Sequence, residues 1–345
     1  LDHDQTDKEI ELDVGSIILS PGFDEYDPTE KSEYGYSKVK NVVTSIEFER
    51  ILSATGPFDG HVKRMSDLKQ PEKVAFIQCV GSRDGSCGNE YCSQVCCMYS
   101  IKEAIIAQEH TPGLTTEIFF MDIRAFGKEF DDYYKRAEEE YGITFTRCRV
   151  ASIEQAAEDD VIITYEEDGE IKTKKFDMAV LAVGMESTDT AKQLSEIMGI
   201  ELTKYSFAQT DTFNPLETSR EGIYVSGAFS GPKDIPDTVA QASGAAAKAS
   251  STIAEARGTL VTEKEYPPEK DIAGQEPRRG VFVCHCGINI GGIVDVPAVT
   301  EYAKSLPNVG YAEFNLFTCS QDTQEKIKDM IEEHNLNRVV VASCT

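Results

Sequence analysis

Cysteine is the residue type of this chain whose number and spacing point most directly to chemistry. The chain has ten cysteines, and five of them lie in the stretch QCVGSRDGSCGNEYCSQVCC. Four of these five follow the pattern C-x12-C-x3-C-C, and they are Cys79, Cys92, Cys96 and Cys97. A site made only of thiolates suits an iron–sulfur cluster or a zinc ion.

The adjacent pair Cys96–Cys97 helps to distinguish between an iron–sulfur cluster and a zinc ion. Zinc sites usually arrange their thiolates as two C-x2-4-C knuckles, and one tetrahedral ion is hard to reach from neighbouring residues. A cubane offers several iron corners. We therefore predict that the four cysteines bind one [4Fe–4S] cluster, with zinc or unliganded core thiols as alternatives. Cys87, inside the long interval, is interpreted as a spare thiol, and Cys148 as a core thiol.

A second set of cysteines is spread more widely, and each piece of it ends a predicted strand. The strands are VFVCHC, FNLFTC and VVVASC, and their cysteines are Cys284, Cys286, Cys319 and Cys344. The carboxyl ends of parallel strands lie together on one rim of a sheet. We therefore predict a second cluster there, although buried strand cysteines are also common core residues. Alternation points His285 to the opposite face, so we interpret it as structural.

The elements around the first cysteine set read as an α/β domain. A strand over Val74–Gln78 precedes the cysteine loop, and a helix over Tyr91–Glu109 follows it. The positive end of that helix would stabilise thiolates. A strand over Thr115–Ile123, an acidic helix over about 128–140 and several short strands come next. This order predicts a doubly wound α/β domain with an antiparallel flap.

Two further segments carry a weaker signal for a flavin. A strand over Ile10–Phe23 ends in a Pro-Gly turn, and Glu221–Ala256 gives a strand, a turn and a helix of small residues. The start of that helix, near Pro236–Thr238, would offer free N–H groups and a positive dipole to the electron-rich edge of a flavin ring. The alternative is a closely packed Ala/Gly helix without a ligand.

Composition excludes several classes of partner. The net charge is −26 and the pI is about 4.6, so nucleic acid and anionic membranes would repel the chain. No apolar run is long enough to span a bilayer. No basic segment followed by an apolar one opens the sequence, so we expect no signal peptide and a cytoplasmic location. Clustered cysteines in such a reducing compartment favour metal binding or redox work over disulfides.

The chain divides into two parts joined by a linker. Residues 262–279 are charged and proline-rich, which is typical of a linker. We predict a first domain over 1–261 and a second, βαβαβ-like domain over 280–345. Because the second unit ends on a strand, we expect the chain to be a fragment or to be completed by another chain.

Three motifs give the chain a resemblance to a known family. They are AFIQCVGSRD with YCSQVCCMYSIKEA, GIYVSGAFSGPKDIPDTVAQASGAA, and GVFVCHCGINIGG with TCSQDTQEKIK and NRVVVASCT. Together they resemble the A subunit of heterodisulfide reductase, a flavin and iron–sulfur protein of electron-bifurcating complexes, over nearly the whole chain. In the family the third motif comes first, and a GxGxxG segment and a ferredoxin domain are present. The chain therefore resembles the end of one family unit followed by the start of another.

The resemblance implies a fold, a function and partners. The fold would be an incomplete thioredoxin-reductase-like core of the FAD/NAD(P)-binding Rossmann type, followed by a small α/β iron–sulfur domain. Its FAD-binding parts would be about 1–23 and 205–261, and residues 70–185 would bear a cluster where relatives of the fold hold NAD(P)H. Electrons would pass between FAD and [4Fe–4S] clusters, with bifurcation as the family's known use. Other subunits of the complex and a second copy of the A-type protein would be partners.

The resemblance also implies the flavin contacts. Lys233 would lie at the redox edge, where a cation stabilises reduced flavin; the alternative is a solvent-exposed turn lysine. The other implied FAD contacts are Pro21, Gly22, Gly227, Ala228, Asp234, Pro236, Thr238, Val239, Gln241 and Ala245. Because the GxGxxG segment that would hold the diphosphate is absent, we expect weak FAD binding by this chain alone and no tight NAD(P)H binding.

Two other functions compete with electron transfer. A zinc-stabilised, non-catalytic assembly module would use the same cysteines. An ordinary pyridine-nucleotide disulfide reductase would need a C-x2-C or C-x4-C pair and a GxGxxG loop, and the sequence has neither.

Overall fold

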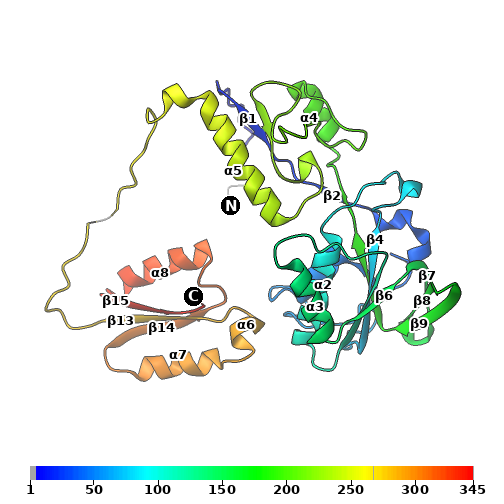
Figure 1. Cartoon of the computed structure of the whole chain (residues 1–345). Coiled ribbons are helices and arrows are strands. Elements are labelled where there is room, and N and C mark those ends of the chain that lie inside the picture. The colour runs from blue at the N-terminus through cyan, green and yellow to red at the C-terminus, as the bar shows by residue number, and fades with distance from the viewer. Residues whose placement is uncertain (1–4, 267, 345) are drawn as a thin grey trace.

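The largest sheet is parallel and has five strands in the order β3-β10-β4-β5-β6 (Figure 1). The computed structural model describes residues 5–266 and 268–344. The five strands are β3 (Val42–Thr44), β4 (Lys73–Val80), β5 (Thr115–Phe120), β6 (Thr144–Arg147) and β10 (Met178–Val183). The helices of this region are α1 (Ser45–Leu52), α2 (Cys96–His110) and α3 (Phe130–Glu139). The predicted α/β fold class is confirmed.

The two central strands of this sheet explain why it forms. Every residue of β10, MAVLAV, is buried, and so is most of β4. A nearly continuous apolar run is typical of a parallel strand that is covered on both faces. On one face Phe76 and Val180 pack with Phe48 of α1 and Ile101 of α2. On the other face, Ile77 belongs to the core cluster shared with the antiparallel strands.

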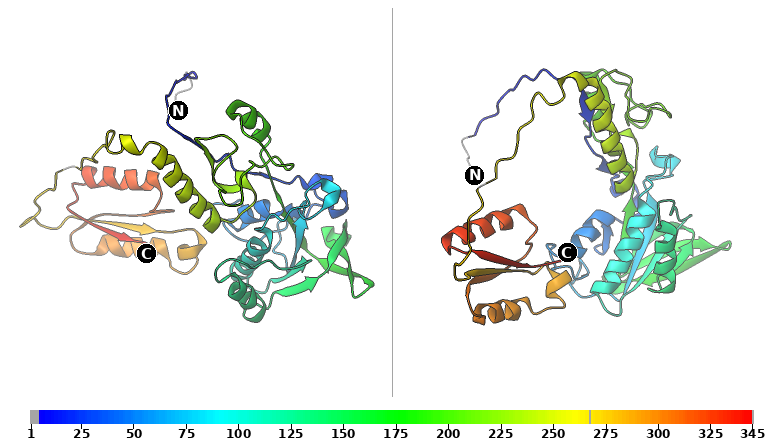
Figure 2. Two further views of the ribbon diagram at one scale, coloured as in Figure 1. Left: turned by 45° about the horizontal axis from the view of Figure 1, so that its top comes forward. Right: turned by 60° about the vertical axis from the view of Figure 1, so that its left-hand side comes forward.

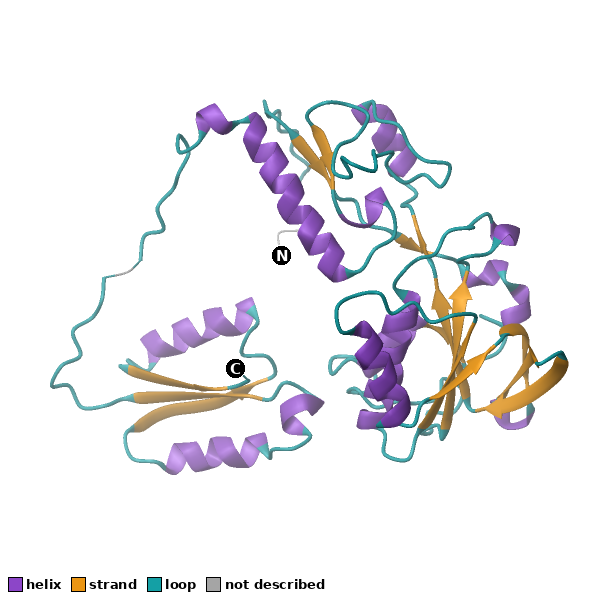
Figure 3. Ribbon diagram, in the orientation of Figure 1, coloured by secondary structure: helices purple, strands orange, loops and turns teal. Residues whose placement is uncertain are grey.

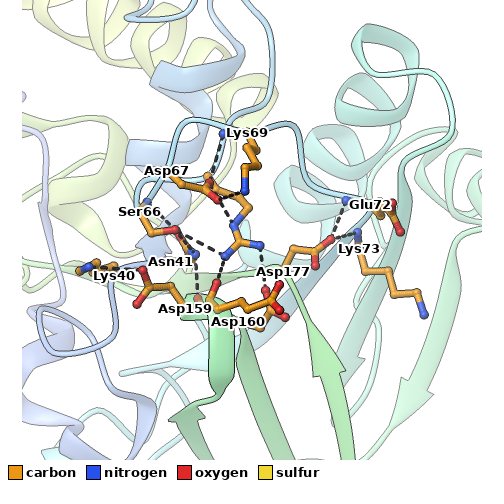
Figure 4. A network of polar contacts seen from close by, with 12 residues as sticks. Lys40, Asn41, Ser66, Asp67, Lys69, Glu72, Lys73, Asp159, Asp160 and Asp177 are labelled. Atoms are coloured by element: carbon orange, nitrogen blue, oxygen red, sulfur yellow. Dashed lines mark hydrogen bonds and ion pairs between the residues drawn. The ribbon is translucent and has the colours of Figure 1, made fainter.

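The predicted antiparallel flap is also present. It consists of β7 (Arg149–Gln155), β8 (Val161–Glu167) and β9 (Glu170–Phe176). A polar network fastens the turn before β8 to the loop that precedes β4 (Figure 4). Arg64 Nη1 donates to Asp160 Oδ1 over 2.8 Å, and Lys175 Nζ lies 2.6 Å from the other Asp160 oxygen. Both Arg64 and Asp160 are buried.

A second region is built from two short strand pairs and two helices. β1 (Ile17–Leu19) pairs in parallel with β12 (Ile223–Val225), and β2 (Asp24–Glu25) pairs with β11 (Met185–Glu186). Its helices are α4 (Ala191–Met198) and α5 (Ile235–Thr252). The prediction of one strand over Ile10–Phe23 is therefore wrong for most of its length. Residues 5–14 are exposed and without strand structure, because only 17–19 have a neighbouring strand to bond.

The C-terminal unit has a separate parallel sheet. β13 (Arg279–Cys284) lies between β14 (Val309–Asn315) and β15 (Arg338–Ala342). Helices α7 (Val296–Ser305) and α8 (Gln321–Glu333) lie on opposite faces of this sheet, and the short α6 (Ile288–Gly291) follows β13 (Figure 3). β15 is an edge strand with Val339, Val340 and Val341 all exposed.

An extended segment connects the two parts of the chain. Residues 257–266 and 268–278 contain no helix or strand, and Figure 2 shows them as an open connection. The domain boundaries themselves stay a prediction. The remaining elements are short 3-10 helices at Pro28–Glu30, Ser32–Tyr34, Gly85–Cys87, Ala157–Asp159, Gly227–Ser230 and Ala254–Ala256. In the part of the chain that the structure describes, no helix combines the length and apolar character needed to cross a bilayer.

Candidate functional site

The first cysteine set lies on a loop that returns tightly on itself. Cys79 is the second-last residue of β4 and has a φ of 60°. Two hydrogen bonds hold the loop in place: Ser93 N donates to Ser82 Oγ (3.0 Å), and Met185 N donates to Ser93 Oγ (2.9 Å). These bonds keep the residues before Cys96 out of the helix. α2 therefore begins at Cys96 rather than at Tyr91 as predicted, and Cys92 lies in the loop.

The structure brings the four predicted cluster ligands together. Burial raises the pKa of the Cys79 thiol to about 11, and the charges of Cys97 and Cys92 add to the rise. Burial also raises the pKa of Cys96, with Cys79, Cys97 and Cys92 acting in the same direction. Such interactions require short separations. The raised pKa values keep the Cys79, Cys96 and Cys97 thiols neutral at pH 7 until a metal displaces their protons.

The spacing of these thiols bears on the kind of metal group that fits. Within residues 5–266 and 268–344, no three cysteine, histidine or acidic side chains converge as closely as a single ion requires. One zinc ion needs its thiolate sulfurs about 2.3 Å from a common point. A cubane binds each thiolate at a different iron atom, so its ligands are spread more widely than those of one ion.

Arg83 is a site residue that the sequence did not reveal. It lies in the loop at a φ of 57° and its guanidinium is paired with Asp122. Burial works to lower the pKa of Arg83, but the bond to Asp122 and the charges of Cys79 and Cys92 raise it. A permanent positive charge beside thiolates stabilises them. One arginine in a loop has no pattern in the sequence that would have identified it.

Cys87 lies in a different environment from the other four. Its Sγ donates to Asp84 O (3.3 Å), and its side chain packs against the core cluster that contains Tyr26 and Tyr34. Asp84 accepts a hydrogen bond from Lys31 Nζ over 2.6 Å, and this ion pair fixes the part of the loop that carries Cys87. The charges that act on the thiols of Cys79, Cys96 and Cys97 come from one another, from Cys92 and from nearby residues, and Cys87 is not among them. This placement supports the interpretation of Cys87 as a spare thiol.

A cavity of about 1020 Å³ separates the cysteine-bearing helix from α5 and its preceding loop. The end of α5 that begins at Ile235 points toward α2 (Figure 1). One wall comes from the turn after β1 and from residues 226–242, and the other wall comes from the start of α2 and from α3. The α2 wall includes Gln94, Val95, Met98, Tyr99 and Lys102. The volume is at the upper end of the range for cofactor sites.

Most of the predicted flavin contacts line this cavity. The seven that do are Gly22, Gly227, Ala228, Lys233, Asp234, Pro236 and Thr238. The other four do not: Pro21 and Val239 are exposed, Ala245 is buried, and Gln241 accepts a hydrogen bond from Gly227 N (3.1 Å). Gln241 thus shapes the loop from behind the wall.

Lys233 is held in place by the loop that precedes it. Its Nζ donates to Gly227 O (2.7 Å), Ser230 Oγ (2.9 Å) and Gly231 O. Burial lowers the pKa of Lys233 to about 8, which leaves the ammonium protonated at neutral pH. The side chain is thus half-buried and bonded, unlike a solvent-exposed turn lysine.

The start of α5 is already occupied by a carboxylate. Asp234 is the N-cap residue, and its side chain accepts a hydrogen bond from Asp237 N over 2.9 Å. This bond satisfies one of the N–H groups expected to be free near Pro236–Thr238, and the negative charge offsets part of the helix dipole. The expected attraction for an electron-rich ring edge is therefore weaker than the sequence suggested.

A second lysine also lines the cavity, and it was not identified from the sequence. Lys102 lines the cavity from α2 and is bonded to both carboxylate oxygens of Glu49, at 2.7 and 2.8 Å. Its partner comes from α1, more than fifty residues away in sequence. No local pattern could have revealed this pairing, although Lys102 does lie one to two turns after Cys97.

The second cysteine set occupies one rim of the C-terminal sheet. Strands β13, β14 and β15 are parallel, as predicted, and Cys284 closes β13. Cys319 and Cys344 follow their strands by a few residues rather than ending them, and both are exposed. Cys286 N donates to Leu316 O (2.7 Å), which ties the Cys284–Cys286 loop to the segment after β14.

Unpaired polar atoms mark the same rim. In the described parts of the chain, His285 Nδ1, Asn315 Nδ2 and Thr318 Oγ1 are buried and have no hydrogen-bond partner. All three belong to the segments that carry Cys284, Cys286 and Cys319. Hydrogen bonds to cluster sulfurs are a normal feature of iron–sulfur sites. The free Asn315 and Thr318 side chains fit such a group, whereas the His285 ring fills the space that a Cβ on Gly291 would need, which supports a packing role.

Comparison with known proteins identifies the family. Over 251 residues the chain is 45% identical to the A subunit of the H(2):CoB-CoM heterodisulfide,ferredoxin reductase from Methanothermobacter marburgensis. It is 43% identical over 258 residues to the iron-sulfur A subunit of the CoB–CoM heterodisulfide reductase from Methanocaldococcus jannaschii. These matches cover 72% and 73% of this chain. Over the matched residues, the chain belongs to the family of heterodisulfide reductase A subunits.

The match covers only part of these heterodisulfide reductase relatives. It spans 38% of the Methanothermobacter protein and 39% of the Methanocaldococcus protein. No family model matches the chain. Among solved structures, the thioredoxin reductases of T. acidophilum and Lactococcus lactis align at 16% and 17% identity with TM-scores of 0.44 and 0.45. Those alignments cover 70% of this chain and 65% and 66% of the two reductases.

Proposed function

We propose that this chain is part of an oxidoreductase subunit that passes electrons between FAD and [4Fe–4S] clusters. The observation that carries the proposal is the cavity of about 1020 Å³ between the implied flavin contacts and the helix that begins with Cys96 and Cys97. A ligand in this cavity would lie against Met98 and Tyr99, within the first turn of the cysteine-bearing helix. The family relationship supports the same pair of cofactors.

The residues of the chain would divide the work as follows. Bound FAD supplies the ability to accept electrons in pairs and release them singly. Tyr99 and Met98 exclude water from one wall of the cavity. Lys233 places positive charge at the cavity of an otherwise strongly acidic protein, which favours an electron-rich ring, while the charge of Lys102 is offset by Glu49. Arg83 stabilises the thiolates that would hold the cluster.

The second thiol set extends the proposal to the C-terminal unit. Cys284, Cys286, Cys319 and Cys344 would hold a second [4Fe–4S] cluster, since a parallel sheet gathers their segments on one rim. Two clusters would give a flavin two routes for its electrons, which is what electron bifurcation requires. We place the chain in a cytoplasmic complex with other subunits and with a second A-type copy. The names of the relatives, as A subunits, imply enzymes with several different subunits.

Anaerobic assembly of the cluster tests the proposal. Iron, sulfide and zinc are measured on the purified chain, together with the EPR spectrum after reduction. Replacing Cys79, Cys92, Cys96 or Cys97 with Ser should each remove one EPR signal and the matching iron. Cys87→Ser is the matched control from the same loop and should keep both.

Two results would contradict the assignment. Loss of the signal in Cys87→Ser with retention in Cys92→Ser would mean that the ligands are wrongly chosen. A colourless protein that contains zinc and binds no FAD would favour the non-catalytic assembly module instead.

A further inference from the structure

A row of polar side chains runs along the buried side of α2. Tyr99, Ser100 and Glu103 follow Cys96 by three, four and seven residues, so the helix places them on one face. The Tyr99 hydroxyl donates to Val183 O (3.0 Å) and accepts from Ser45 Oγ (3.2 Å). Polar groups in a helix face that is otherwise packed in the core call for an explanation.

Glu103 is the most unusual member of this row. The residue is 2% exposed, and its Oε2 has no hydrogen-bond partner among the described residues. Ser100 is fully buried, and its Oγ also lacks a partner there. Burial raises the pKa of Glu103 well above its usual value, the charge of Glu49 raises it further, and Lys102 opposes the rise. Glu103 therefore keeps its proton at pH values where exposed glutamates have lost theirs.

Glu103 lies between the proposed cluster site and an ion pair that reaches solvent. Tyr99 follows Cys96 by three residues and precedes Glu103 by four in α2, so it lies between them on one face of the helix. The charges of both residues raise the pKa of Tyr99, although burial is the larger cause. On the other side, the Glu49–Lys102 pair is nearly half exposed. The charged or titratable groups acting on Glu103 are Glu49 of α1 and Lys102 and Tyr99 of α2. Strands β4 and β10 contribute apolar side chains to this face of α2.

We propose that Glu103 is a proton-exchanging group coupled to the redox state of the centre held by Cys96 and its neighbouring thiols. At pH values where Glu103 is ionised while the centre is oxidised, its carboxylate takes up one proton from solvent, by way of the Glu49–Lys102 pair, when an electron arrives. When the electron leaves, the carboxyl group returns that proton. The proposal rests on the proposed function, because it needs a redox centre at the thiols.

The reason is electrostatic and reciprocal. An added electron is a negative charge about two helical turns from Glu103 in a medium of low dielectric constant, so it increases the affinity of Glu103 for a proton. By linkage, a proton on Glu103 stabilises the reduced centre by the same free energy. An iron–sulfur centre with no such group would have a potential that changes little with pH.

The test is an EPR-monitored potentiometric titration of the assembled protein at several pH values. In the wild type the midpoint potential should fall as pH rises, by at most about 59 mV for each tenfold change in proton concentration. In Glu103→Gln it should be nearly constant. Glu109→Gln, on the exposed end of the same helix, is the matched control and should behave as the wild type. A constant wild-type potential, or an equal slope in Glu103→Gln, would overturn the proposal.

A second measurement on the ligand-free chain separates this proposal from the proposed function. A glutamate whose folded pKa is raised stabilises the fold less as pH increases, because the folded state holds a proton that the unfolded state has lost. Relative to Glu103→Gln, the wild-type unfolding constant should rise about tenfold per pH unit between the unfolded pKa and the folded one. Parallel curves would refute the buried acid even if no cluster assembled. Glu103→Met replaces the Gln variant if the latter does not fold.

Discussion

At the scale of single residues, the charge on Lys233 is controlled by two opposing effects. Its ammonium donates to two carbonyl oxygens and a hydroxyl, which favours the charged form. Burial works against that form and lowers the pKa to about 8. The balance leaves a lysine that is charged at neutral pH and loses its proton under mildly alkaline conditions.

This balance predicts a specific pH dependence of stability. Between pH about 8 and the unfolded lysine value of about 10.4, the unfolded state holds a proton that the folded state has released. The free energy of unfolding of the wild type should therefore rise with pH relative to Lys233→Met. The unfolding constant should fall by less than tenfold per pH unit, because solvent partly screens this site. Urea titrations measure it, with Lys192→Met as the exposed control; equal curves for all three proteins would contradict the lowered pKa.

The sequence was sufficient to predict site residues whose type recurs at a characteristic spacing. It was not sufficient for residues whose role depends on a partner far away in the sequence. The gathering of Cys79, Cys92, Cys96 and Cys97 follows from their positions around one strand end and one helix start. Lys102 lines the cavity while bonded to Glu49 of another helix, and that pairing has no local pattern in the sequence. The capping role of Asp234 depends on where α5 begins, and the sequence left that open by a few residues.

At the scale of elements, the cysteine loop depends on one glycine. Gly81 has a φ of 68°, and a Cβ there would lie 2.0 Å from the ring of the buried Tyr26. Gly81→Ala should therefore cost about 2–4 kcal/mol of stability and prevent iron binding, because strain and overlap add. Gly85→Ala, in the same loop with no heavy atom within 4 Å, should change stability by no more than about 0.5 kcal/mol. Chemical unfolding and iron content test both, and equal effects would mean that the loop adapts.

The flap is fastened by the buried Arg64–Asp160 pair. Removing Arg64 leaves the buried Asp160 with the more exposed Lys175 as its remaining partner, and breaking a buried pair costs about 3–5 kcal/mol. Arg64→Met should show a loss of this size, whereas Lys69→Met should be nearly neutral because Lys69 is largely exposed. Thermal and urea unfolding provide the comparison. A loss below about 1 kcal/mol would mean that Lys175 alone satisfies Asp160.

Helices and strands with a strong hydrophobic pattern of their own were predictable from the sequence. Elements whose bounds depend on hydrogen bonds to a distant segment were not. The buried runs of β4 and β10, the alternation in the flap and the three strands of the C-terminal sheet could all be read from the sequence. The strand predicted over Ile10–Phe23 failed because a strand needs a partner, and β12 offers one only to residues 17–19. α2 begins later than predicted because hydrogen bonds to the side chains of Ser82 and Ser93 compete with the backbone hydrogen bonds of a helix.

At the scale of the whole molecule, the segment between the two parts should be the first site of proteolysis. Residues 257–266 and 268–278 are mostly exposed and lack secondary structure. Trypsin should therefore cut at Lys264 or Lys270 before it cuts within either folded part. Mass spectrometry of a brief digest should show two stable fragments that separate at this segment. Earlier cleavage within the five-stranded sheet would mean that the first part is not an independently folded unit.

The open edge of β15 has a consequence for how the protein behaves in solution. A strand edge with unpaired backbone groups and three exposed valines can template the addition of a second chain. The net charge of −26 opposes such contacts through long-range repulsion. That repulsion reaches about 10 Å at 0.1 M salt but only about 3 Å at 1 M. Colloidal stability of this acidic chain should thus decline as ionic strength increases, and concentrated salt would be the condition that most favours its aggregation.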